Sequence, residues 1–140
     1  MMEIFWILLG AFGACAFFSL LFHAPRRFVL PAALIGTAGY ALYLLFECKM
    51  GSPVAGAFAA SLLIALLSEW VARKQKAPAT LFVSGGIITM VPGGGLYRTM
   101  LALIEGDYSA AAAYGVETVM IAGCIALAIA PVSAFFRSRK

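Results

Sequence analysis

A proline followed by three glycines, residues 92–95, interrupts an apolar segment that is long enough to cross a membrane. Proline lacks the amide proton that a helix needs, and glycine has no side chain to pack against a neighbour. Because lipid offers no hydrogen-bond partner, each backbone group freed by the break would cost several kcal/mol if it faced hydrocarbon. Such a break is stable only where protein or a water-filled cavity covers it. Broken helices at this depth often form solute sites, so the break is the first candidate for one.

The rest of the chain consists largely of apolar segments, at 4–22, 28–46, 53–72 and 109–136. Each is near or above the roughly 20 residues that a membrane helix needs. The interrupted segment, 80–104 broken at 92–95, has halves of roughly 18 and 13 Å by helical rise, which cross a core of about 30 Å only together. With 64% hydrophobic and 11% charged residues among 140, the chain is predicted to be an all-α polytopic membrane protein. Five transmembrane spans are expected to form a single transmembrane domain over residues 1–140.

Lys and Arg residues fall in short clusters between the apolar segments, where they act as orientation signals. If the broken segment crosses the membrane, one side holds eight of them and the other holds Lys49; the eight are Arg26, Arg27, Arg73, Lys74, Lys76, Arg137, Arg139 and Lys140. If the segment enters and leaves on one side, the count becomes five against four. The positive-inside rule favours crossing, with the amino terminus outside and the carboxyl terminus in the cytoplasm.

Two charged residues lie within the predicted membrane region. Arg98 follows the break, and Glu117 lies roughly 12 Å into the last span. A charge at such depth is costly unless it is paired or hydrated. In the functional interpretation, Arg98 binds a substrate carboxylate through two hydrogen bonds, and Glu117 binds an amino group or carries a coupling proton. In the structural alternative, the two pair with each other or with a neighbouring helix, or Arg98 extends to the outer surface.

The break also predicts bare backbone groups. Free amides are expected at residues 96–98, where the second half begins, and free carbonyls at 88–91, where the first half ends. The amide end of such a break favours an anion and the carbonyl end a cation. Tyr97 is expected to border this cavity, either as a solute contact or as a packing aromatic. The candidate substrate-binding residues are therefore Pro92, Gly93, Gly94, Gly95, Tyr97, Arg98 and Glu117.

Other functional classes find no support in the residues. Cys15, Cys48 and Cys124 follow no metal-binding or disulfide spacing, and His23 has no second ligand near it in sequence, so no metal is expected. The glycine run lacks the Lys-Ser or Lys-Thr of a phosphate loop, and no hydrolase motif is present. The net charge of +4 comes from the Lys and Arg clusters between the apolar segments, which act as orientation signals and not as a nucleic-acid surface. Neither a nucleic-acid partner, nor a cofactor, nor enzymatic activity is expected.

The order of these features resembles the small component of the bacterial threonine/serine exporter family in its split, two-protein form. The resemblance covers about 17–136. It rests on Ala24-Pro25-Arg26-Arg27, Ala33, Gly36 and Gly39, Trp70 with the basic cluster after it, Pro78, and above all Met90-Val91-Pro92-Gly93 followed by Leu96-Tyr97 and Met100. Many relatives carry a second proline where this chain has Thr89. Thr89 therefore joins the candidate site, as a hydroxyl offered to a freed carbonyl or to a solute.

The resemblance implies export of threonine, serine or similar small amino acids, or of small dicarboxylates, across the bacterial inner membrane. It implies a complex with a larger multi-span partner, driven by proton-motive force. Five helices enclose little interior, so a partner or a homo-oligomer is the natural completion, and glycine and alanine stripes suit close helix packing. The alternative function is a scaffold subunit that transports nothing itself and stabilises a partner transporter. A small drug exporter would need an acidic residue inside the first span, and 4–22 contains none.

Overall fold

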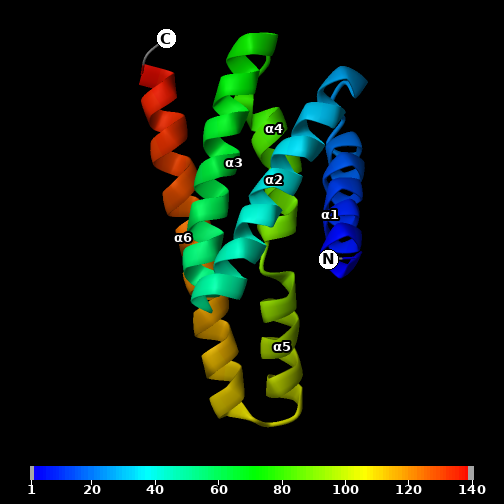
Figure 1. Ribbon diagram of the computed structural model, residues 1–140. Helices are drawn as coiled ribbons and strands as arrows, with labels where there is room; N and C mark the ends of the chain where they lie inside the picture. Colours follow the sequence, from blue (N-terminus) through cyan, green and yellow to red (C-terminus); the bar gives the residue numbers. More distant parts are fainter. Residues whose placement is uncertain (1, 139–140) are drawn as a thin grey trace.

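The protein folds into helices joined by short turns, with no strand among residues 2–138, the range that the computed structural model describes (Figure 1). The elements are α1 (Met2–Leu21), α2 (Arg26–Met50), α3 (Pro53–Gln75), α4 (Ala79–Ile87), the short 3-10 turn η1 (Ile88–Met90), α5 (Gly93–Ile104) and α6 (Tyr108–Ser138). In the described range, α1, α2, α3 and α6 are each long and apolar enough to span a membrane. Residues 79–90 and α5 are long and apolar enough only when taken together, bent by 44°, so the described range holds four candidate spans, or five if this bent pair is one span. The predicted all-α polytopic membrane fold is confirmed.

Local sequence sets where several helices begin and end. Ser52 caps α3 by accepting a hydrogen bond from the Ala55 amide at 3.4 Å, and Asp107 accepts one from Ala110 at 3.0 Å at the start of α6. Gly51 ends α2 in the left-handed conformation, φ +62°, which glycine adopts without steric cost. Three helices continue beyond the predicted apolar segments, and α3 runs on from 72 to Gln75. α2 continues from 46 to Met50, and α6 runs through Pro131 to Ser138.

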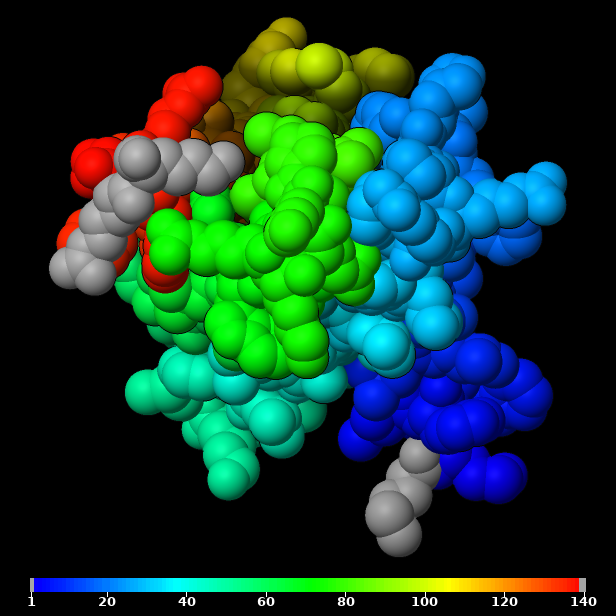
Figure 2. Space-filling model, turned by 90° about the horizontal axis from the view of Figure 1, so that it is seen from above, coloured from blue at the N-terminus to red at the C-terminus, as the bar shows by residue number. Residues whose placement is uncertain are grey.

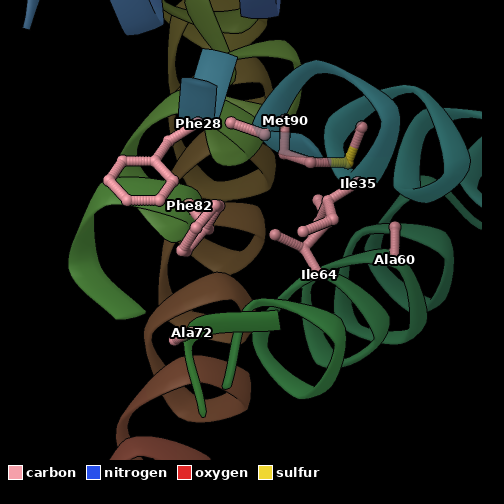
Figure 3. Packing of buried hydrophobic residues seen from close by; sticks show 8 residues of the cluster. Phe28, Ile35, Ala60, Ile64, Ala72, Phe82 and Met90 are labelled. Atoms are coloured by element: carbon pink, nitrogen blue, oxygen red, sulfur yellow. The ribbon is translucent and has the colours of Figure 1, made fainter. Parts of the chain in front are cut away.

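The core of the bundle lies where α4 meets α2 and α3. Phe82 of α4 is fully buried and contacts Phe28 of α2 edge to face, with the ring centroids 5.6 Å apart. Ile35, Ile64 and Met90 come together from α2, α3 and η1 in the same cluster (Figure 3). The first half of the broken span is therefore covered by protein, as a helix interrupted within lipid requires.

Two glycines allow α2 and α4 to come this close. A Cβ on Gly36 would lie 2.9 Å from both the Cα and the carbonyl oxygen of Gly86, which is closer than real Cβ atoms approach other atoms. It would also overlap the Sγ atom of Cys15 in α1. The contact between Gly36 and Gly86 thus fixes how α4 sits among the first three helices.

The broken span carries the chain from one end of the bundle to the other. Near the end of α3, the Nη2 atom of Arg73 donates a hydrogen bond to the carbonyl oxygen of Phe136 in α6 at 3.2 Å. The last turns of α3 and α6 therefore lie at the same end, next to the start of α4, as Figure 1 also shows. This is the arrangement that the crossing topology requires. We call it the basic end, because it gathers Arg26, Arg27, Arg73, Lys74, Lys76 and Arg137, and we call the other the outer end.

Candidate functional site

The break in the fourth span is narrower than the predicted 92–95. Regular helix ends at Ile87, η1 follows, and Val91 is extended with ψ 124°. Pro92 has no amide proton and disfavours helical geometry in the residue before it, which explains why the helix stops here. The expectation that Gly93, Gly94 and Gly95 are unwound is wrong, since they form the first turn of α5. The 44° bend therefore depends on two residues.

The predicted free amides at 96–98 are also misplaced. The Leu96 amide donates to the Pro92 carbonyl at 3.2 Å, and Tyr97 and Arg98 lie in the second turn, where amides bond within the helix. The Gly93 amide donates to the Val91 carbonyl at 2.7 Å. The positions at which a helix leaves amides without an internal partner are therefore Gly94 and Gly95. A Cβ at Gly93 or Gly94 would meet nothing within 4 Å, so a small solute can reach this turn.

The break lies between the level of Gly36 and the outer end of α2. Gly86 touches Gly36, and Pro92 lies six residues further on, about 9–12 Å along the axis. From Gly36, α2 continues for about 21 Å to its end at Met50. Pro92 thus sits roughly 10 Å inside the outer end of α2, and α5 extends from there past the turn between α2 and α3 (Figure 1).

Thr89 lies apart from the other candidate residues, on the side of the break that packs into the bundle. Its Oγ1 atom is buried and has no hydrogen-bond partner in the described part of the chain. Cys15 of α1 is its polar neighbour, and the Cys15 thiol donates to the Gly86 carbonyl at 3.9 Å. The hydroxyl therefore does not bind a carbonyl freed by the break. A buried hydroxyl without a partner is a place where water or a polar solute gains a hydrogen bond.

α5 and the start of α6 form a tightly packed antiparallel hairpin. A Cβ on Gly95 would overlap the Thr118 hydroxyl, and one on Gly115 would touch the Thr99 methyl at 3.5 Å. Thr99 and Thr118 donate their hydroxyl hydrogens to carbonyls of their own helices, Thr99 to Gly95 at 2.8 Å. Gly95 thus lies in a helix contact, and the open part of the glycine run is Gly93 and Gly94.

The hairpin brings Arg98 and Glu117 to one side. Gly95 faces Thr118 and Thr99 faces Gly115. At 100° per residue, Arg98 lies about 60–100° from the two contact residues of α5, and Glu117 about 100–160° from the two contact residues of α6. For antiparallel helices these angles point to the same side of the hairpin. Arg98 is exposed and Glu117 half-buried, and the two side chains form no ion pair with each other. Tyr97, 68% exposed, projects away from α6.

No carboxylate lies within ion-pairing distance of Arg98 or of another cationic side chain in the range 2–138. Arg98 and Glu117 are therefore both without a charged partner in the described part of the chain. Glu117 does lie within electrostatic range of Tyr43 in α2, which stacks on Tyr40 with ring centroids 5.9 Å apart. Tyr43 is therefore the polar neighbour of Glu117 from α2.

Sequence reasoning missed Tyr40 and Tyr43. Both are half-buried on α2, and Tyr43 packs against the core next to the break. The available signal was two tyrosines three residues apart in an otherwise apolar span, which places them on one helix face. As to metals, no group of three or more His, Cys, Asp and Glu side chains gathers within 2–138, and Cys15, Cys48 and Cys124 are free thiols.

Four continuous apolar helices beside a broken one, with charged residues after the break, form an architecture that recurs in membrane transport proteins. The particular family follows from comparison of the sequence. Residues 7–135 match the family described as Threonine/Serine exporter, ThrE, and because this is nearly the whole chain, the protein belongs to that family. It is a multi-pass membrane protein with an exporter-type transport role, as the resemblance in the sequence indicated. No curated protein and no solved structure matches the chain.

Proposed function

We propose that this chain is one subunit of an exporter for threonine- or serine-type amino acids or small dicarboxylates. It acts with a larger multi-span membrane partner and draws on proton-motive force. In this proposal the protein resides in the bacterial inner membrane, with the basic end in the cytoplasm and the outer end facing out. The family supports the transport role, and the distribution of Lys and Arg supports the orientation.

One observation carries the proposal: Arg98 and Glu117 share a side of the hairpin, and neither has a charged partner within residues 2–138. A guanidinium suits a carboxylate, and a carboxylate suits an ammonium or a proton. The open first turn of α5 adds amide donors next to them. Together these groups offer one cation, one anion and free amides, which is a complement for a small zwitterion.

The site is open on this chain, which supports a partner subunit. α5 packs against α6 and has no comparable contact with another helix of the described chain. Leu96, Met100 and Ile104 of α5 are all exposed, Ile104 to 83%. Arg98 and Glu117 can bind a solute away from bulk water only if another protein surface encloses them. A larger membrane protein seated on α5 would provide that cover.

The test is efflux of radiolabelled threonine, serine and succinate from cells that express the chain with its partner. Arg98→Ala and Glu117→Gln are expected to lower efflux at least tenfold while the amount of protein in the membrane is unchanged. Lys49→Ala is the matched control, because Lys49 is also a cation at the outer end but lies on α2, away from the hairpin. Equal loss of protein in the membrane, or equal loss of efflux in the control, would refute the site.

The second candidate function is a scaffold that stabilises a partner transporter. The packing of Gly95 against Thr118 favours it, because part of the glycine run then serves helix contact. In a scaffold, Arg98→Ala and Glu117→Gln would leave efflux intact, whereas changes in the hairpin contact would first reduce co-purification with the partner.

A further inference from the structure

A cavity of about 930 Å³ opens at the basic end, far from the hairpin. It lies between the end of α3, the start of α4 and the end of α6, and the residues 77–80 form part of its wall. Figure 2 looks onto this end, with the last turns of α3 in green beside those of α6 in red. Three helices from distant parts of the sequence thus build one hollow where the membrane-spanning bundle ends.

The charged lining of this cavity is mostly cationic. Arg73 and Lys76 come from the end of α3 and Arg137 from the end of α6, against a single carboxylate in the lining, Glu69. Within residues 2–138 none of these cations has a carboxylate in ion-pairing range. The cavity therefore carries an excess of positive charge that the described chain does not neutralise.

Arg73 is exposed, but its guanidinium is held against α6 by Phe136. Its Nη2 atom donates to the Phe136 carbonyl at 3.2 Å, and its guanidinium lies 4.6 Å from the centroid of the Phe136 ring. The guanidinium keeps further N–H groups for another acceptor. A solvated surface arginine has no such support, so this arrangement favours a binding group.

The start of α4 adds to the positive potential. Pro78 precedes the helix without a side-chain cap, and Pro78, Ala79 and Thr80 all line the cavity. An uncapped helix start presents amide hydrogens and the positive end of the helix dipole. The three cations already indicate that the cavity suits an anion, and the uncapped start of α4 adds to the same positive potential.

We propose that this cavity binds the phosphate-bearing headgroup of an anionic phospholipid. Val83 and Ile129 supply an apolar wall below the cations, so polar and apolar linings meet at the end of the membrane helices, where a phospholipid changes from headgroup to acyl chain. Phosphate accepts bidentate hydrogen bonds from arginine. An amino-acid zwitterion fits less well, because the three cations repel its ammonium group.

The test measures lipid binding to the purified chain by native mass spectrometry. Phosphatidylglycerol and phosphatidylcholine with identical acyl chains are compared, and inorganic phosphate is a third arm. The intact protein is expected to bind phosphatidylglycerol at least tenfold more tightly than phosphatidylcholine. Inorganic phosphate at millimolar concentration is expected to displace less than half of it.

Two variants with matched charge locate the site. Arg73→Gln with Arg137→Gln should weaken phosphatidylglycerol binding about tenfold, whereas Arg26→Gln with Arg27→Gln, at the same end but outside the cavity, should change it less than twofold. Glu69→Gln removes the carboxylate and should tighten binding about two- to fivefold, which tests the site even if the double arginine variant fails to fold. Equal binding of both lipids, equal loss in both arginine pairs, no gain in Glu69→Gln, or full displacement by inorganic phosphate would overturn the proposal.

Discussion

Replacing Gly36 by alanine should separate α2 from α4. The new Cβ would lie 2.9 Å from the Cα and the carbonyl oxygen of Gly86, whereas carbon atoms pack best at about 3.5–4.0 Å. Because the obstacle is backbone, the two helices must move apart by about 0.6–1.1 Å, the difference between these distances. Such overpacking typically costs about 1–3 kcal/mol, more than the roughly 0.5–1 kcal/mol that alanine gains over glycine in a helix.

The measurement is thermal unfolding of the purified chain in a mild detergent. For a domain of this size the net cost corresponds to a fall in Tm of about 2–10 °C. Gly13→Ala is the matched control, because Gly13 lies within α1 and a Cβ there meets nothing within 4 Å. Its Tm should stay the same or rise.

A double variant separates the backbone obstacle from the side-chain obstacle. Cys15→Ala removes the thiol that a Cβ on Gly36 would also meet, but it leaves the Gly86 backbone in place. Gly36→Ala with Cys15→Ala should therefore regain less than half of the lost Tm. Full recovery, or a Gly36→Ala protein as stable as Gly13→Ala, would refute the argument that a direct backbone contact joins α2 and α4.

Three further predictions concern the break. Pro92→Ala restores an amide that can donate within a continued helix, so the 44° bend should decrease. The distance between spin labels at Ser84 and Leu103 measures this change. Efflux should fall, while Tm should stay the same or rise. Gly94→Ala should leave Tm unchanged because the surroundings of Gly94 are open, whereas Gly95→Ala should lower Tm because its Cβ would clash with Thr118. Loss of efflux in Gly94→Ala at normal Tm would place the solute at the first turn of α5. Thr89→Val removes a buried hydroxyl that lacks a partner, so Tm should stay equal or rise, and a fall in Tm would mean that the hydroxyl is bonded through water.

The features predicted well from the sequence depend on local chemistry or on simple counts. Pro92 lacks the amide proton that a continued helix needs, so the break could be located to within a few residues, although α6 runs through Pro131 without a break. The distribution of Lys and Arg favoured a broken segment that crosses, and the hydrogen bond from Arg73 to Phe136 agrees with that arrangement. The apolar segments located the four long helices α1, α2, α3 and α6, because each must match the thickness of a bilayer.

The features predicted poorly depend on contacts between distant residues. Glycine is compatible with either a helix or a break, so the helical state of Gly93–Gly95 was not determined by the residues themselves. Gly95 belongs to a helix contact because Thr118 packs against it, and Thr89 is buried because Cys15 of α1 lies beside it. The cavity at the basic end could not be predicted either, since Arg73 and Arg137 are brought together only by the packing of α3 against α6.

The length of α6 has a mechanical consequence. Its 31 residues form one helix of about 46 Å, in which Glu117 and Arg137 lie about 30 Å apart. If such a rod pivots about one end, a tilt of about 5° displaces the opposite end by about 4 Å, which exceeds the length of a hydrogen bond. A contact that fixes α6 at the basic end would thereby also set the position of its acidic side chain toward the outer end.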